Sequence, residues 1–191
     1  NGAECFPEMV NYLDINIGRL VDAVEKNGLS NNTIIIFLAD NGTHKAVTSV
    51  WGDEGIKIEG GKMTMTDRGA RVPLIVKWPE KVRPGTHCDD LVELADFLPT
   101  ICEITSAPVP SQAIRGQSFY PQLLGKKGKP KKYVHIAYKE NSQIRIKDWI
   151  YTNDDKLIKV NKLGEPENEP VKDESHKKTR EELKNILEQI K

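Results

Sequence analysis

The stretch of residues 34–42 reads IIIFLADNG. Its first six residues are all apolar and begin with a β-branched run, which predicts a strand over residues 33–39 that is covered on both faces, as in a parallel sheet. The strand ends in a carboxylate, a carboxamide and a glycine. Asp-Asn-Gly is ordinary turn chemistry, but open α/β sheets also bind ligands just beyond the carboxyl ends of their strands. Both interpretations stay open at this point.

The residues on either side of this strand predict an α/β arrangement. Before it, apolar side chains recur at the three-and-four spacing of one helical face, and Asn27-Gly28 supplies a helix stop. After it, residues 40–70 are rich in glycine without a clear period, so we expect a long irregular loop, which is usually functional or disordered. A second strand bounded by prolines follows, and then a helix with Pro99 as a kink or a start. The two helices and this strand are expected over residues 7–26, 91–106 and 72–79.

A different pattern begins after the basic stretch GKKGKPKK, residues 125–132. Short alternating segments predict an antiparallel meander, and an apolar stripe at helical spacing predicts a terminal helix over residues 174–190. We therefore divide the chain into residues 1–125, a basic linker over 126–132 and a small subdomain over 133–191. The four strands of the meander are expected over residues 133–138, 143–146, 149–152 and 156–160.

The composition excludes several classes of protein. The 191 residues include 28 basic and 28 acidic side chains, so no net charge points to nucleic acid as a partner. No apolar run is long enough to cross a bilayer, so a membrane span is not expected. Cys5, Cys88 and Cys102 are odd in number and widely spaced, which excludes a zinc site or a disulfide framework and leaves room for one bridge at most.

Three groups of residues could carry chemistry. Asp40 and Asn41 offer hard oxygen donors that suit Ca²⁺ or Mg²⁺ and suit zinc poorly. In Gly60-Gly61-Lys62 the glycines allow a backbone to approach a ligand closely, and the lysine presents a point charge to an oxyanion such as sulfate or phosphate. His44 could reach the same crevice. Each has an ordinary alternative: a turn for the pair, a solvated loop position for the lysine and a surface position for His44.

The order of these features is more specific than its parts. Helix, buried strand, Asp-Asn-Gly, long loop, Gly-Gly-Lys and then GARVPLIV at residues 69–76 closely resembles the C-terminal half of the catalytic domain of the sulfatase family. Within the family, the loop reading Asp-Asn-Gly-Thr-His is similar to that of bacterial-type arylsulfatases. The resemblance covers residues 6–125 in motif detail and the remainder more loosely. It implies an α/β fold, a partial alkaline phosphatase-like α/β/α sandwich followed by a small C-terminal antiparallel sheet with a terminal helix.

The resemblance also implies roles for individual residues. Asp40 and Asn41 match the strand-end pair that supplies two ligands to a calcium ion, and Lys62 matches the lysine that contacts the substrate sulfate. His44 stands where related sequences often have a histidine near the site, and it is kept as a catalytic candidate. The implied reaction is hydrolysis of a sulfate ester, in a sulfated small molecule or sulfated glycan, by a formylglycine nucleophile in a periplasmic or secreted enzyme.

The chain departs from the family pattern in several ways. Met63 stands where family members commonly have glycine after Gly-Gly-Lys, which puts the shape of the turn around Lys62 in question. The Cys-x-Pro-Ser-Arg pattern that yields formylglycine is absent, since Cys5-Phe6-Pro7 lacks the Ser and Arg and is interpreted as a chance match. The family's other calcium ligands and its assisting Lys and His have no counterpart either. We therefore expect a C-terminal fragment that is inactive alone and whose partner is the missing N-terminal half of the same protein.

Two other functions fit these residues. A phosphate or phosphonate ester hydrolase of the same superfamily shares the metal-site chemistry, although the Gly-Gly-Lys and Arg-Val-Pro context favours a sulfatase. A non-catalytic module could bind anionic glycans through residues 125–132, but a run of lysines is more often a solvated linker.

Overall fold

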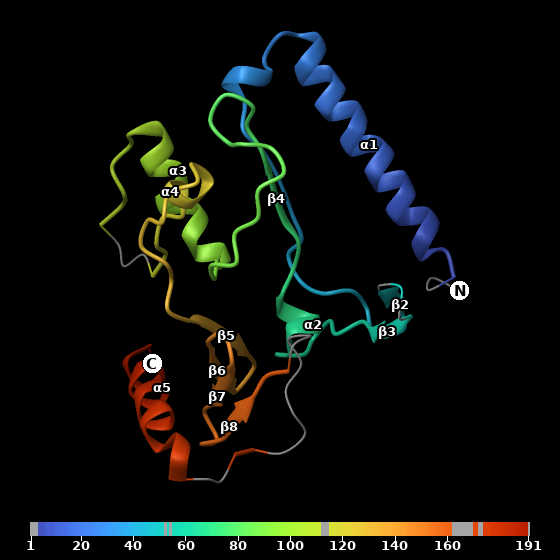
Figure 1. Ribbon diagram of the computed structural model, residues 1–191. Helices are drawn as coiled ribbons and strands as arrows, with labels where there is room; N and C mark the ends of the chain where they lie inside the picture. The colour runs from blue at the N-terminus through green and yellow to red at the C-terminus, as the bar shows by residue number, and fades with distance from the viewer. Residues whose placement is uncertain are drawn as a thin grey trace. The chain divides into compact units, whose positions relative to one another are not determined.

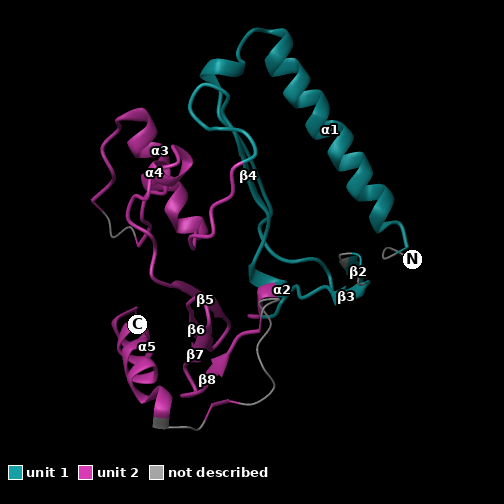
Figure 2. Cartoon of the chain, viewed as in Figure 1, with its two compact units in different colours: residues 1–64, 68–85 teal, residues 65–67, 86–191 magenta. Residues whose placement is uncertain are grey.

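The computed structural model describes residues 4–51, 53, 55–111, 115–161, 170–171 and 174–190, and the chain divides into two compact units (Figures 1 and 2). The first unit contains residues 1–64 and 68–85, and the second contains residues 65–67 and 86–191. These two units are defined by the contacts that their residues make with one another. The separate division of the chain at residues 125 and 133 stays a prediction.

The first unit begins with helix α1 (Phe6–Lys26), which confirms the helix predicted over residues 7–26. A short 3-10 helix, η1 (Ser30–Asn32), leads into strand β1 (Ile35–Leu38), and β1 pairs with β4 (Leu74–Lys77). Pro73 directly precedes β4, as its missing N–H requires. A salt bridge of 2.5 Å between Lys77 and Glu25 joins β4 to α1.

Two expectations for this unit need correction. The ladder that β1 makes is antiparallel, with Leu38 opposite Leu74, and its four residues are half-buried; the parallel neighbour that the sequence predicted is not among the described strands. The loop predicted over residues 40–70 contains a hairpin of β2 (Thr48–Trp51) and β3 (Ile56–Glu59), followed by the short helix α2 (Asp67–Ala70). The hairpin was missed because its glycines obscured two short alternating runs.

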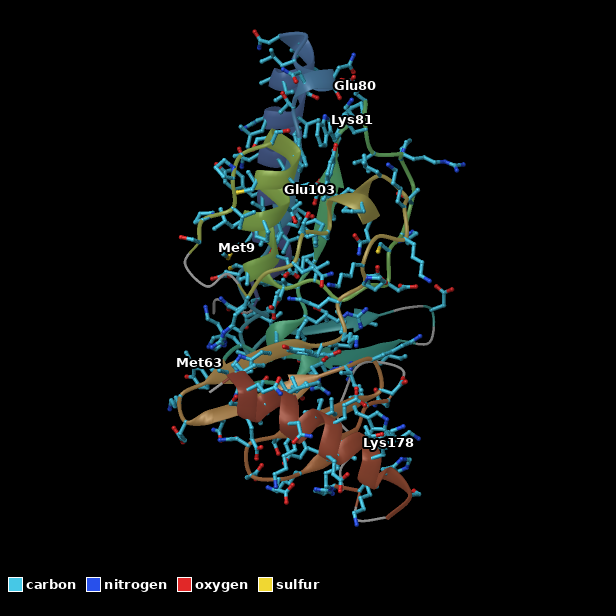
Figure 3. All side chains as sticks on the ribbon, turned by 90° about the vertical axis from the view of Figure 1, so that its left-hand side faces the viewer. Met9, Met63, Glu80, Lys81, Glu103 and Lys178 are labelled. Carbon is cyan, nitrogen blue, oxygen red and sulfur yellow. The ribbon has the colours of Figure 1, made fainter. Side chains whose placement is uncertain are left out.

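The apolar stripe of α1 lies largely on the surface. No residue of this helix, which the structure describes in full, is buried. Met9, labelled in Figure 3, is 61% exposed, Leu13 is 50% exposed and Leu20 is 69% exposed. Met9, Leu13 and Leu20 are spaced so that they fall on one face of the helix, so their exposure leaves an apolar stripe on the surface of the first unit.

The second unit contains the predicted meander. Strands β5 to β8 form one sheet in chain order, each antiparallel to the next. Helix α5, preceded by the 3-10 helix η3, packs against this sheet, and the predicted terminal helix is thereby confirmed. The bounds are β5 (Val134–Tyr138), β6 (Asn141–Arg145), β7 (Trp149–Thr152), β8 (Leu157–Lys159), η3 (Glu174–His176) and α5 (Lys177–Ile190).

The core of the second unit lies between the sheet and α5. Ile144 and Leu157 are fully buried, and Leu183 and Leu187 of α5 are 2% and 3% exposed. Burial of side chains of this size contributes about 1.5–3 kcal/mol each. The helix is also held by Arg180, whose guanidinium donates to the carbonyl oxygens of Asp155 at 2.7 Å and of Val171 at 2.8 Å.

The remaining helices of the second unit fall within residues 1–125, the first part of the division predicted from the sequence. The helix predicted over residues 91–106 is present as a 3-10 turn, η2 (Leu94–Asp96), followed by α3 (Phe97–Thr105), so Pro99 lies in the first turn of α3. A short helix, α4 (Tyr120–Leu123), comes next. The three cysteines are not bridged. Within the described residues, no helix combines the length and the apolar character that a membrane crossing needs.

One tyrosine of the second unit should ionise late. Burial and a hydrogen bond from its hydroxyl to Asp155, 2.9 Å long, raise the pKa of Tyr151 from 10.0 to about 12. Because the folded-state pKa lies above the unfolded value, this group's contribution to stability is complete below pH 10 and is lost as the pH rises from 10 through 12. Tyrosinate absorbance should therefore show a late step that Tyr151→Phe removes and Tyr138→Phe retains. A late step that persists in Tyr151→Phe would contradict this assignment.

Candidate active site

The predicted metal-ligand pair lies on a turn that packs tightly against another part of the backbone. After β1 the chain passes through Asp40, which is exposed, and Asn41, which is half-buried. The next amide, that of Gly42, donates to the carbonyl oxygen of Gly69 at 2.8 Å. A Cβ atom on Gly42 would lie 1.8 Å from the carbonyl oxygen of Arg68. Only glycine permits this approach, so the turn has a fixed place in the first unit.

The predicted substrate lysine is attached to the same stretch of backbone. The amide of Lys62 donates to the carbonyl oxygen of Thr43 at 2.9 Å, and the amide of Gly60 donates to that of Val47 at 2.8 Å. A Cβ atom on Gly60 would lie 2.1 Å from the carbonyl oxygen of His44, so this crossing also depends on glycine. The backbone of Lys62 is thus fixed close to the Asp-Asn turn, while its side chain is exposed.

The turn that carries Lys62 has the shape that a glycine would favour. Met63 has φ of 69°, which lies in the left-handed region, and its side chain is 65% exposed (Figure 3). Thr64 closes the turn, since both its amide and its hydroxyl donate to the carbonyl oxygen of Gly61, at 2.9 and 2.7 Å. The turn around Lys62 therefore keeps the shape that glycine would give it. Met63 adopts a positive φ, which carries a steric cost for methionine and none for glycine.

His44 makes local contacts. Its Nδ1 accepts a hydrogen bond of 3.1 Å from the amide of Ala46, and its carbonyl oxygen accepts one of 3.0 Å from Val47. With Nδ1 as an acceptor, the neutral ring carries its proton on Nε2. These contacts explain the shape of the loop, and a catalytic role for His44 stays a prediction.

Asp40 and Asn41 offer the type of ligand atom that calcium prefers, but too few of them to complete its coordination shell. A carboxylate and an amide carbonyl are oxygen ligands of the type that Ca²⁺ prefers, but the ion takes six to eight. Within the residues that the structure describes, no group of three or more His, Cys, Asp or Glu side chains could hold a metal ion. The pair can therefore supply only part of a calcium shell.

Sequence reasoning missed a hollow on the β2–β3 hairpin. Its volume is about 720 Å³, and it borders the Lys62 loop through Glu59 and Arg68. The strand alternation would have revealed it, because paired positions on the two strands share a face. The hollow is lined by Thr48, Val50, Lys57, Glu59 and Arg68.

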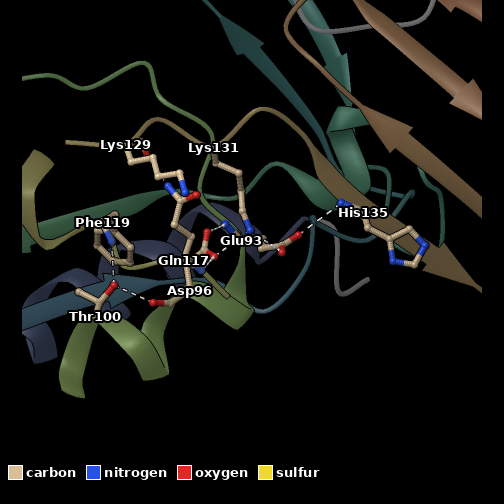
Figure 4. Close-up of polar contacts among 8 residues, drawn as sticks. All are labelled: Glu93, Asp96, Thr100, Gln117, Phe119, Lys129, Lys131 and His135. Carbon is tan, nitrogen blue, oxygen red and sulfur yellow. Dashed lines mark hydrogen bonds and ion pairs between the residues drawn. The ribbon is translucent and has the colours of Figure 1, made fainter. Parts of the chain in front are cut away.

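Sequence reasoning also missed a buried polar cluster in the second unit (Figure 4). Asp96 is 1% exposed and accepts hydrogen bonds from the amides of Gln117 and Glu93, at 2.7 and 2.9 Å. Lys131 lies 2.8 Å from Asp96 and 2.6 Å from Glu93. Burial lowers the pKa of Lys131, but the two carboxylates outweigh burial and leave it raised.

This cluster changes the interpretation of the basic stretch. Lys131 belongs to the run predicted to be a solvated linker, yet it is held by two carboxylates, whereas the other lysines of residues 126–132 are exposed. Lys131 pairs with both Glu93 and Asp96 (Figure 4), so the cluster fastens residues 93–96 to residue 131. The sequence signal was the pair Glu93 and Asp96, which form a reciprocal capping box at η2.

Comparison with known proteins places the chain in a family. A model described as sulfatase matches residues 2–107, which is more than half of the chain. The chain belongs to the sulfatase family. A second model, described as the C-terminal part of N-sulphoglucosamine sulphohydrolase, matches residues 61–191.

Similar sulfatases are much longer than this chain. Human arylsulfatase A is 34% identical over 146 residues, which are 76% of this chain and 28% of arylsulfatase A. Human steryl-sulfatase is 31% identical over 127 residues, covering 63% of this chain and 22% of the relative. An ulvan-active sulfatase of Formosa agariphila is 33% identical over 107 residues, covering 56% and 18%. The chain thus spans less than a third of the length of these relatives.

Solved structures confirm the predicted fold class. A structure in complex with its substrate D-glucosamine-2-N,6-O-disulfate gives a TM-score of 0.71 at 25% identity, covering 95% of this chain and 38% of that one. A structure from work on glycosaminoglycan metabolism by Bacteroides thetaiotaomicron gives 0.70 at 21% identity, covering 93% and 42%. Like them, this sulfatase chain combines an α/β part with an antiparallel sheet and a terminal helix.

Replacing Met63 by glycine should stabilise this sulfatase chain. A left-handed conformation costs an ordinary residue about 1–2 kcal/mol, while glycine loses up to about 1 kcal/mol more backbone entropy on folding. Met63→Gly should therefore raise the free energy of unfolding by up to about 1 kcal/mol, measured by urea denaturation. Met63→Ala keeps the Cβ atom and should give no such gain. A clear loss of stability in Met63→Gly would show that the methionine side chain, and not its backbone, matters at this turn.

Proposed function

We propose that this chain contributes part of the active site of an enzyme that hydrolyses sulfate esters, with Lys62 binding the substrate sulfate and with Asp40 and Asn41 as two ligands of a calcium ion. The observation that carries the proposal is the hydrogen bond from Lys62 to Thr43. It joins the loop of the lysine to the loop of the Asp-Asn pair, so a cation and two hard oxygen donors come from one locally rigid stretch of a sulfatase chain.

The placement of Lys62 suits the binding of a sulfate group. Its backbone amide is bonded and the following turn is closed by Thr64, while its side chain is exposed. An ammonium carried by this fixed backbone would neutralise charge on the sulfate oxygens as the ester bond between sulfur and the alcohol oxygen breaks.

Asp40 and Asn41 would hold the calcium ion from the end of β1. When bound, the ion would supply Lewis-acid polarisation of the sulfate oxygens. The two residues contribute one negative charge and two oxygen atoms, and the fixed turn at Gly42 keeps them together. The other ligands would come from outside this chain, as would the nucleophile, because no Cys-x-Pro-Ser-Arg pattern occurs in the sequence.

The surface of α1 supports a role as one part of a larger enzyme. The apolar stripe that leaves Met9, Leu13 and Leu20 exposed is a face that another part of the protein would cover. We therefore also propose that this chain alone does not hydrolyse sulfate esters.

The substrate class that we propose is a sulfated sugar. Two findings support it: the match to a model described as an N-sulphoglucosamine sulphohydrolase, and the similarity at 25% identity to a structure that holds D-glucosamine-2-N,6-O-disulfate. A hydrolase of phosphate esters is the alternative that the test must separate.

Removal of the Lys62 ammonium should cripple sulfate hydrolysis. In the full-length protein that contains this chain, Lys62→Ala should lower kcat/KM for 4-nitrophenyl sulfate by about 10²–10³-fold, as loss of one preorganised charge-stabilising group does. The control is Lys81→Ala, because Lys81 is an exposed lysine that contacts Glu80 at 3.4 Å and lies away from the Asp-Asn turn in sequence. It should leave kcat/KM unchanged.

Two results would contradict the proposal. Equal activity of Lys62→Ala and the unaltered protein would remove Lys62 from the site. Faster hydrolysis of 4-nitrophenyl phosphate than of the sulfate would assign the protein to the phosphate ester hydrolases.

Calcium binding should depend on Asp40. Asp40→Ala removes one charge and one ligand from the proposed shell, so the Kd for Ca²⁺ of the full-length protein should rise at least about tenfold, measured by calorimetry after chelation. Asp53→Ala, a change at an exposed carboxylate of the hairpin turn, is the control and should leave Kd unaltered. An unchanged Kd in Asp40→Ala would exclude Asp40 as a ligand.

A further inference from the structure

The three residues that follow the Lys62 turn belong to the C-terminal part of the structure. Residues 65–67 make their contacts within the second unit, whereas Thr64 and Arg68 on either side belong to the first (Figure 2). The chain that carries the proposed sulfate-binding lysine therefore runs directly into a segment held by other elements, and that segment begins three residues after Lys62.

Strand β6 holds this segment with two buried polar side chains. Arg145 donates from Nε to Asp67 Oδ1 at 3.1 Å and from Nη2 to Asp67 Oδ2 at 3.2 Å, which is a two-pronged contact between the planar groups. Its Nη1 donates to the carbonyl oxygens of Ile146 and Lys147. Gln143 donates to the carbonyl oxygen of Met65 at 2.7 Å.

These contacts are shielded from water. The side chains of Arg145 and Asp67 are 10% and 11% exposed, and Gln143 is 5% exposed. Gln143 and Arg145 are two residues apart on β6 and share a face, and the residue between them, Ile144, belongs to the apolar core with Leu183. One face of the strand thus builds the core and the other grips residues 65–67.

A pair of this kind is weak support for stability. Burying an ion pair costs desolvation that roughly cancels its attraction, and apolar residues often stabilise such a place equally well. What a two-pronged pair does secure is geometry, because the planar groups meet in one orientation. A geometric role fits the place of the pair in the chain, five residues after Lys62.

We propose that Arg145 and Gln143 are positioning residues for Lys62. The hydrogen bonds to Thr43 and Val47 fix the start of the loop at residues 60–62, and the grip of β6 on residues 65–67 fixes its end. The lysine then lies in a short stretch of chain anchored on both sides. The inference rests on the proposed function of Lys62 and adds that β6 acts on the lysine along the chain, through residues 65–67.

The first test uses kinetics in the full-length protein. Arg145→Lys keeps the charge and loses the two-pronged contact, so kcat/KM for 4-nitrophenyl sulfate should fall by about tenfold to a hundredfold, as small misplacements of binding groups do. In a Lys62→Ala background the same change should have almost no further effect, because the group that it positions is gone. Arg180→Lys is the matched control: Arg180 also anchors backbone carbonyls of the second unit, but not residues 65–67.

Several outcomes would overturn the inference. An equal fold-loss from Arg145→Lys with and without Lys62 would mean that Arg145 acts independently of the lysine, and an equal loss in Arg180→Lys would mean a general weakening of the fold. If Lys62→Ala itself is fully active, the proposed function fails and this inference falls with it.

The second test does not use activity. Amide hydrogen exchange of residues 60–64 should become at least severalfold faster in Gln143→Ala, a milder change that removes only the bond to Met65, and unaltered in Arg180→Lys. Unchanged exchange in Gln143→Ala would show that the grip of β6 does not reach the Lys62 turn, whatever the reaction catalysed.

Discussion

The first unit depends on the close crossing of backbones at four glycines. At Gly42, Gly60, Gly61 and Gly69 an added Cβ atom would lie between 1.8 and 2.5 Å from a neighbouring atom, which real side chains do not tolerate. The crossing brings the end of β1, the start of the Lys62 turn and residues 68–69 into backbone contact. The four glycines carry no side chain, and this lets the backbones come close enough to bring the Asp40–Asn41 turn and the Lys62 turn together.

The two units are stabilised by different kinds of interaction. The second unit has a conventional core, in which α5 covers the sheet and Ile144 and Leu157 are fully buried. The first unit relies on hydrogen-bonded backbone and on half-buried strands, and its longest helix buries no residue. The polar groups follow the same contrast: Asp96 is buried and pairs with the half-buried Lys131, whereas Asp40 and Lys62 are exposed. Exposure of Asp40 and Lys62 suits the site that we propose, which would meet its substrate and further ligands from elsewhere.

The elements with a strong period were predictable from the sequence, and the contacts between distant residues were not. Residues 7–26, the four strands of the meander and the terminal helix carry their own signals, and each was found within about three residues of its place. The antiparallel direction of β4 relative to β1 was not predicted, because an apolar run indicates that both faces of a strand are covered and does not indicate the direction of the neighbouring strand. The proposed site residues Asp40, Asn41 and Lys62 came from a motif, while the hydrogen bond that joins their loops through Thr43 required the structure.

The hydrogen-bonded ion pair between Arg145 and Asp67 joins residues 78 positions apart, and no local sequence pattern predicts it. The same holds for Lys131, which a composition-based interpretation treats as one of several solvated lysines. In both cases a charged residue was predictable as a type and unpredictable as a partner, because its partner lies far along the chain. Sequence reasoning of this kind finds a candidate group, and the structure then decides what that group contacts.

The order of the strands in the second sheet has a consequence for how the chain folds. Each of β5 to β8 pairs with the strand that follows it, so the sheet closes through short loops. Local pairing of this kind forms quickly, since little chain entropy is lost before contacts are made. During synthesis, however, α1 emerges well before the sheet and presents an apolar stripe that its own unit does not bury. Within these residues, the helix that its own unit leaves exposed is therefore made before the sheet that pairs through local contacts.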